Sequence, residues 1–132
     1  RVAVGFEQNR LSMLLAILHR HGGLQVGDQD VFVNAVGGIR VEETSSDLAL
    51  ILAVVSSFRD RSLPSDLICF GEVGLSGEIR PVPNGQERLR EAAKHGFKAA
   101  IVPEGNRPSA LIEGLEVETV STLKDALSAI GV

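Results

Sequence analysis

Apolar residues recur along this 132-residue chain with two different periods. Between residues 9 and 21 they fall at helical spacing, and the Gly22-Gly23 pair that follows is a typical helix end. Residues 47–58 are apolar nearly all round, which predicts a helix buried on most sides. Alternating apolar positions in RVAVGF and LEVETV instead predict strands. The expected order is a strand over 1–6, a helix over 9–21, a strand over 31–36, a helix over 47–58, strands over 66–75 and 77–82, a helix over 83–97, strands over 98–103 and 115–120, and a helix over 121–130.

This order of strands and helices predicts an α/β layered fold. A length of 132 residues is typical of one domain, and it suffices to bury a core without a metal or a disulfide. We therefore expect a single domain over 1–132, in which Ser121 or Thr122 is the N-cap of the last helix. Because the chain opens directly with the strand-like RVAVGF, we expect it to be a piece of a longer protein.

Composition and charge narrow the possible functions. The chain is 44% hydrophobic and 23% charged, with a formal net charge of −4, which argues against a wholly basic nucleic-acid-binding module. It has neither Trp nor Tyr, so it lacks the stacking platforms that single-strand binders commonly use. The single cysteine, Cys69, cannot pair within the chain, which favours a reducing, cytoplasmic setting. No apolar run reaches the ~18 residues of a membrane span, so we expect no membrane partner.

The stretch ETSSDLAL precedes the most apolar helix and allows three interpretations. Thr44 and Asp47 have the spacing of a capping box, in which the hydroxyl groups of this segment only satisfy free backbone N–H groups. Alternatively, Ser45 is a nucleophile at the positive end of the helix, beside a potential oxyanion site, and then needs a base within hydrogen-bond reach. In the third interpretation the helix start binds a peptide or an anion, although the charge of Asp47 would repel an anion there.

Other chemistry-bearing residues favour structural roles. The three histidines lack the spacing of a metal site, and we expect exposed helix positions for His19, His21 and His95. Cys69 lies in the apolar run DLICF, which predicts an inert core residue. The glycines of GEVGLSGEI lead from strand to strand and match no phosphate loop, so turn geometry explains them.

Two stretches together resemble a known catalytic domain. FGEVGLSGEIRPVPNGQERLREAAKHGFKAAIVP is similar to the C-terminal half of the Lon protease catalytic domain, and ETSSDLALILAVVSS resembles the Lon helix that opens with Gly-Pro-Ser-Ala-Gly. The resemblance implies a Lon protease catalytic-domain-like fold. It places Ser45 at the position of the Lon nucleophile and Gln86 at that of the catalytic lysine. The hydroxyl residue that assists in Lon corresponds to Gly74.

The residue at the lysine position decides whether this dyad can work. In a Ser–Lys dyad a desolvated lysine with a lowered pKa takes the proton from the serine, whereas the amide of Gln86 is not a base. Arg88 and Arg90 hold their protons far above neutral pH, and Lys94 lies ~12 Å further along the helix. We therefore expect no catalytic residues in this chain. The alternative is a residual serine peptidase in which another subunit or an unrecognised residue supplies the base for Ser45.

Over essentially its whole length the chain resembles the Lon-like C-terminal domain of the bacterial RadA (also called Sms) family of DNA repair and recombination ATPases. The sequence segments that show this resemblance are GFEQNRL, FVNAVGGIRVEETSSDLAL and FGEVGLSGEIRPVPNGQERL. It implies a non-proteolytic scaffold that supports a homo-hexameric ring and DNA binding while recombination intermediates are processed, with RecA as a partner of the full-length protein. In that family a four-cysteine zinc motif and a RecA-like ATPase core precede this domain. Neither is present here, so we expect no ATP, Mg or Zn in this chain.

Contact with DNA would require basic residues to cluster despite the acidic total charge. The candidates are Arg59, Arg61, Arg80, Arg88, Arg90 and Lys94. For each one, a solvated position or a local ion pair such as Glu87–Arg90 is the alternative. If DNA binds, phosphate contacts should dominate and the affinity should fall steeply with added salt.

Overall fold

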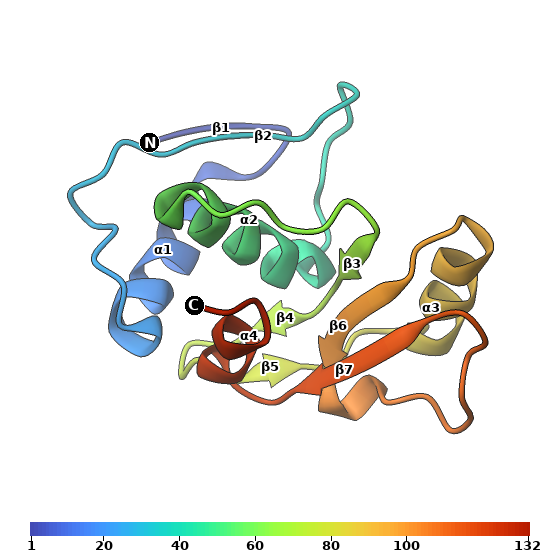
Figure 1. Cartoon of the computed structure of the whole chain (residues 1–132). Coiled ribbons are helices and arrows are strands. Elements are labelled where there is room, and N and C mark those ends of the chain that lie inside the picture. The colour runs from blue at the N-terminus through green and yellow to red at the C-terminus, as the bar shows by residue number, and fades with distance from the viewer.

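Helices and strands alternate along all 132 residues described by the computed structural model, which confirms the predicted mixed α/β fold (Figure 1). Most elements lie where the hydrophobic pattern placed them, although the strands are shorter than predicted. The elements are β1 (Val2–Val4), α1 (Gln8–Gly22), β2 (Phe32–Asn34), the 3-10 helix η1 (Thr44–Ser46), α2 (Asp47–Arg59), β3 (Leu67–Cys69), β4 (Glu72–Val73), β5 (Ile79–Arg80), α3 (Gly85–Lys94), β6 (Ala99–Pro103), the 3-10 helix η2 (Glu104–Asn106), β7 (Glu116–Val120) and α4 (Leu123–Ala129).

The strands form three separate sheets. β1 and β2 pair in parallel, β3, β6 and β7 form a parallel sheet in the order β3-β6-β7, and β4 and β5 form an antiparallel pair. The single strand predicted over 66–75 is therefore wrong, because the chain leaves one sheet after Cys69 and enters another at Glu72. Gly71 lies at this break with a φ of 153°, a conformation that favours glycine.

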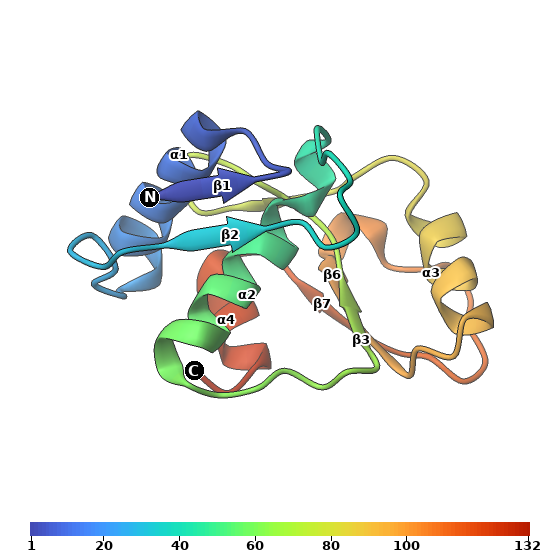
Figure 2. The same cartoon turned by 90° about the horizontal axis from the view of Figure 1, so that it is seen from above.

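The molecule has four layers, which are the β1–β2 ribbon, the helices α1, α2 and α4, the β3-β6-β7 sheet, and α3 (Figures 1 and 2). A core cluster of 20 buried residues joins α1, α2 and α4 to one face of the β3-β6-β7 sheet, which Ile101 contributes to from β6. A smaller cluster of six joins the other face to α3, through Ala100 and Val102 of β6 and Leu89 of α3. The β1–β2 ribbon packs on the opposite side of α1 and α2, with Ala3 facing the large cluster.

Local sequence determines where the helices begin and end. The Glu7 carboxylate accepts hydrogen bonds from the N–H groups of Asn9 and Arg10 at the start of α1, and Gly23 ends that helix in the left-handed conformation. The predicted cap of the last helix is confirmed, since Thr122 caps α4 in a capping box. None of the helices is both long and apolar enough to cross a lipid bilayer.

Candidate functional site around the start of helix α2

Ser45 lies in η1, just before α2, and backbone hydrogen bonds to Gly71 fix the position of this segment. The Gly71 N–H donates to the Ser45 carbonyl at 2.9 Å, and the Leu48 N–H donates to the Gly71 carbonyl at 3.0 Å. A Cβ at Gly71 would lie 3.0 Å from Ile79 and 3.2 Å from Pro103, so a side chain there would require these two side chains to shift by a few tenths of an ångström. Ser45 itself is only 8% exposed. The break between β3 and β4 therefore holds the serine in place.

The hydroxyl groups of this segment do not cap the helix, so the predicted Thr44–Asp47 capping box is wrong. Ser46 is the residue at the N-cap position and makes no side-chain cap. Its hydroxyl donates instead to the Glu43 carbonyl at 2.9 Å, and the Ser45 hydroxyl donates to Glu43 Oε2 at 3.3 Å. The physical reason is that Asp47 does not turn back toward the helix start, because its carboxylate is used elsewhere.

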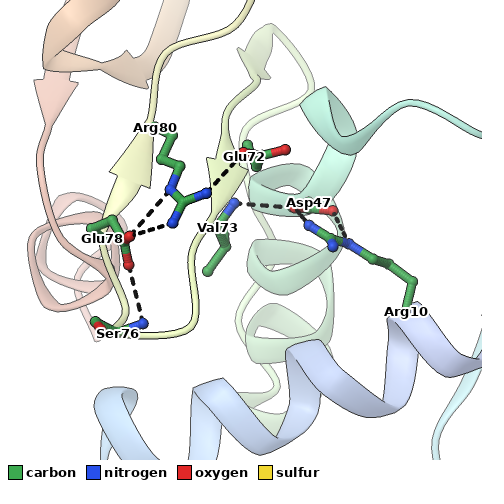
Figure 3. A network of polar contacts seen from close by, with 7 residues as sticks. All are labelled: Arg10, Asp47, Glu72, Val73, Ser76, Glu78 and Arg80. Atoms are coloured by element: carbon green, nitrogen blue, oxygen red, sulfur yellow. Dashed lines mark hydrogen bonds and ion pairs between the residues drawn. The ribbon is translucent and has the colours of Figure 1, made fainter.

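Asp47 forms a buried clamp with two other elements (Figure 3). Its side chain is 3% exposed and pairs with the Arg10 guanidinium of α1, with Arg10 Nε 3.0 Å from Oδ1 and Nη2 bonded to Oδ2. Oδ2 also accepts the Val73 N–H of β4 at 3.1 Å. The hydrogen bonds that Arg10 donates to Asp47 raise the pKa of Arg10. The clamp thus joins α1, α2 and β4, and both lone-pair regions of a buried carboxylate are satisfied.

A second ion-pair network lies on the β4–β5 hairpin beside this clamp (Figure 3). Arg80 donates twice to Glu78 Oε2, at 3.1 and 2.8 Å, and its Nη1 lies 3.5 Å from Glu72 Oε1. The hydrogen bonds from Arg80 lower the pKa of Glu78. Because Arg80 already faces two carboxylates, its charge is largely neutralised within the chain.

Gln86, at the lysine position of the Lon resemblance, is hydrogen-bonded on the side of α3 that faces the 107–114 loop. Its Nε2 donates to Ser109 Oγ at 2.9 Å, and its Oε1 accepts from Arg90 Nη2 at 3.0 Å. No hydrogen bond connects it to Ser45. The local ion pair expected between Glu87 and Arg90 is not formed, since Arg90 bonds the nearer amide instead.

The side chain of α3 that does approach the serine is Arg88. Its Nη2 lies 3.8 Å from Glu43 Oε2, the same oxygen that accepts the Ser45 hydroxyl. Arg88 also donates to the Pro83 carbonyl at 2.9 Å and lies over the Phe70 ring. Sequence reasoning missed Glu43, although its position two residues before Ser45 was a usable signal.

Gly74, at the position of the Lon helper residue, is enclosed by the hairpin turn. The N–H of Gly74 donates to the Glu78 carbonyl at 2.9 Å, and Gly77 N–H donates back to the Gly74 carbonyl at 3.0 Å. A Cβ at Gly74 would lie 2.2 Å from the Glu78 carboxyl carbon. A hydroxyl-bearing residue at position 74 would therefore displace the Glu78 side chain from its contacts with Arg80 and the Ser76 N–H. The φ of 80° at Gly77 supports the turn interpretation of these glycines.

Four of the six candidate DNA-contacting residues lie in two groups at opposite ends of the molecule, whereas Arg80 on β5 and Arg88 on α3 already face carboxylates (Figures 1 and 2). Arg59 and Arg61 lie at and just after the C-terminal end of α2, whereas Arg90 and Lys94 lie on α3. These four residues form no ion pair with a carboxylate of the chain. The structure therefore does not gather all six candidates into one patch, and it leaves two smaller basic patches free.

The histidines and the cysteine hold structural positions. His19 and His95 are exposed as predicted, but His21 is half-buried, because the Gly77 turn packs within contact of its side chain. Burial raises the pKa of Cys69 to about 11, so its thiol stays protonated at neutral pH, in agreement with the predicted inert role.

Comparison with known proteins assigns the chain to a family. A family model described as subunit ChlI of Mg-chelatase matches residues 2–106. The DNA repair protein RadA of Haemophilus influenzae is 69% identical over 130 residues, which are 98% of this chain and 28% of that protein. The DNA repair protein RadA of Escherichia coli is 70% identical over 97% of the chain and 28% of its own length, and that of Aquifex aeolicus is 45% identical over 96% and 28%. The chain thus spans little more than a quarter of the length of these relatives. Because the family model covers most of its residues, the chain belongs to the family described as subunit ChlI of Mg-chelatase.

Proposed function

We propose that this chain serves DNA repair as a non-proteolytic, Lon-like scaffold segment of a longer RadA-like ATPase. In this role it helps copies of the protein to assemble into a ring and contributes contacts to DNA. The observation that supports the proposal best is the 69–70% identity over 97–98% of the chain with proteins named DNA repair protein RadA. ATP, Mg and Zn would belong to parts of such a protein outside these residues.

The non-proteolytic part of the proposal rests on the surroundings of Ser45. A serine nucleophile needs a base in hydrogen-bond reach, and the amide of Gln86 at the lysine position bonds Ser109 instead. The Ser45 hydroxyl donates to the Glu43 carboxylate, which Arg88 also approaches. A carboxylate is a far weaker base than the neutral lysine amine of a Ser–Lys dyad.

A residual peptidase remains the second candidate, because Glu43 is an acceptor at 3.3 Å from the Ser45 hydroxyl. A fluorophosphonate probe distinguishes the two candidates, since it labels activated serines. We expect no labelling of the 132-residue chain under conditions that label a control serine hydrolase. Labelling of the wild type that disappears in Ser45→Ala, while Ser46→Ala is still labelled, would show a reactive Ser45 and contradict the non-proteolytic role.

The DNA-binding part of the proposal rests on the cations that no carboxylate of the chain neutralises. With a net charge of −4, the chain repels DNA as a whole, so binding requires a local patch. Arg90 and Lys94 lie one helical turn apart on α3, and Arg59 and Arg61 form the other patch. Phosphate contacts of this type release counterions and make binding strongly dependent on salt.

The proposed DNA contact is tested by the fluorescence anisotropy of a labelled oligonucleotide mixed with the chain. The salt concentration is varied from about 50 to 200 mM, because the affinity of phosphate contacts falls over this range. If the α3 patch contacts phosphates, the double variant Arg90→Ala/Lys94→Ala lowers the slope of log K against log salt by about 2. The matched variant Arg59→Ala/Arg61→Ala tests the α2 patch in the same way. Arg107→Ala is the control, because Arg107 is exposed but already paired with Glu104. Unchanged slopes in both double variants would remove the DNA contact from the proposal.

A further inference from the structure

A groove of about 560 Å³ runs between β2 and α2, on the side of the molecule away from α3. Residues 31–34 form one wall, and Ala53, Val54 and Phe58 of α2 form the other. Most of the side chains that line it are hydrophobic, and two aromatic rings on its walls, Phe32 and Phe58, are 74% and 37% exposed. None of the polar networks around Ser45 reaches it. Apolar surface of this kind on a soluble protein marks an interaction site.

The backbone of β2 indicates the shape of the occupant. Val31 accepts from Val2 N at 2.9 Å and Ala35 donates to Val4 O at 2.8 Å, so the odd-numbered residues of this segment face β1. β1 is the only strand partner of β2, and the N–H and C=O groups of Phe32 point to the opposite, unpaired edge. A free strand edge is satisfied by an extended polypeptide segment, which supplies backbone donors and acceptors in register.

The charge at one end of the groove indicates the chemistry of that segment. Asp30 lines the groove and Asp28 lies two residues before Asp30 in the chain, and neither carboxylate forms an ion pair within the chain. The groove therefore fits an extended segment that carries apolar side chains and ends in a cation.

The chain itself displays a segment with these side chains, although in the free chain Gly37 and Gly38 form a turn with φ of 89° and 69°. Residues 36–40, with the sequence VGGIR, follow β2 and project away from the rest of the molecule (Figure 1). Val36 is 84% exposed and Ile39 is 60% exposed, which is unusual for two large apolar side chains so close together. Arg40 pairs only with Glu42, and both side chains are more than three-quarters exposed, so this ion pair is weak and easily exchanged.

We propose that residues 36–40 of one copy dock into the β2–α2 groove of a second copy, with Ile39 against the α2 wall and Arg40 beside Asp30. The inference rests on the self-assembly proposed above and assigns a surface to it. Because the donated segment and the accepting groove are different patches, the contact is head-to-tail and leaves one free patch on each side of every pair. Repetition of such a contact builds a ring or an open filament instead of a closed dimer.

Two substitutions test the two patches separately, with sedimentation velocity over a range of concentrations as the measurement. Ala53→Arg fills the groove from an exposed helix position, and Ile39→Asp removes the donated apolar side chain. Both positions are solvent-exposed, so the fold should be kept, and circular dichroism checks this. The matched controls are Ala16→Arg on the exposed face of α1 and Leu111→Asp, whose side chain is fully exposed on another loop.

We expect the wild type and both controls to assemble and each patch variant to be monomeric. An equimolar mixture of Ala53→Arg and Ile39→Asp should form dimers and nothing larger, because one intact groove and one intact segment remain. If the patch variants assemble like the wild type, this contact is wrong while the self-assembly of the proposed function stands. A wild type that is monomeric at every concentration overturns both proposals. A mixture that stays monomeric refutes the head-to-tail geometry.

Discussion

Replacing Asp47 with alanine should cost this chain a large part of its stability. The side chain is 3% exposed and holds both the Arg10 guanidinium and the Val73 N–H. After truncation, Val73 N–H has no acceptor inside the protein, and Arg10 loses the carboxylate that raised its pKa. The substitution therefore removes one contact to each of α1 and β4 at the point where Ser45 is positioned.

The size of the effect follows from the burial of the partners. Removing one member of a fully buried ion pair costs about 3–5 kcal/mol, and leaving a buried donor unsatisfied costs about 1–3 kcal/mol. The Arg10 side chain is 31% exposed, so water can solvate part of the abandoned charge, and the lower end of the first range applies. We expect a loss of about 3 kcal/mol in the free energy of unfolding. For 132 residues this corresponds to a fall in Tm of roughly 10 °C.

Urea denaturation followed by circular dichroism measures this loss, and two variants show its origin. Asp47→Asn keeps an acceptor for Val73 N–H without the charge, so it should lose about half as much. The double variant Arg10→Met/Asp47→Leu replaces the pair with apolar side chains and should recover part of the loss. A free energy of unfolding for Asp47→Ala within about 0.5 kcal/mol of the wild type, the usual effect of an unimportant surface change, would refute the clamp.

Three further predictions concern other parts of the chain. Hydrogen bonds from Arg107 hold the pKa of Glu104 at about 2, below its ordinary value of 4.5, so the stability this group contributes is present above pH 4.5 and is lost as the pH falls toward 2. An NMR titration of Arg107→Ala should show the Glu104 pKa returning toward 4.5, and an unchanged value would contradict this cause. Gln86→Lys should not create peptidase activity against casein, because the Ser45 hydroxyl bonds a carboxylate elsewhere; measurable cleavage would show that the two positions do meet. Thr122→Ala removes the side-chain acceptor of the Asp125 N–H, one half of the capping box, and should lower the free energy of unfolding by about 1 kcal/mol, again measured in urea, whereas no change would mean that α4 does not depend on its cap.

The helices could be predicted closely from the sequence, because periodic apolar residues and local end signals determine them. The Gly22-Gly23 pair lies at the observed end of α1, and Thr122 is the observed cap of α4. The break between β3 and β4 could not be predicted in this way. Residues 66–75 have a continuous strand-like composition. Only the backbone hydrogen bonds that Gly71 forms with Ser45 and Leu48 divide them between two sheets. Such long-range pairing leaves no periodic signal in the segment itself.

The candidate site was predicted only in part for a similar reason. The sequence predicts the local part of the site, in which Ser45 directly precedes the α2 helix. It also shows that Gln86 stands where the Lon resemblance places a lysine. The distant part of the site could not be predicted, since Arg10 lies 37 residues before Asp47. A lone aspartate at the start of a helix looks like a cap, and only the burial of its carboxylate shows that it must have a charged partner instead.

The β3-β6-β7 sheet separates two buried clusters of very different size, and this difference determines which part of the molecule opens most easily. The α3 layer is secured by only six buried residues, against 20 on the other face of the same sheet. Opening that layer alone therefore exposes far less apolar surface than complete unfolding, and amide exchange in α3 should be the fastest among the four helices. The protein thus carries one helix whose exposed cations can be exchanged through mutation, or displaced by a ligand, without disturbing the remainder of its architecture.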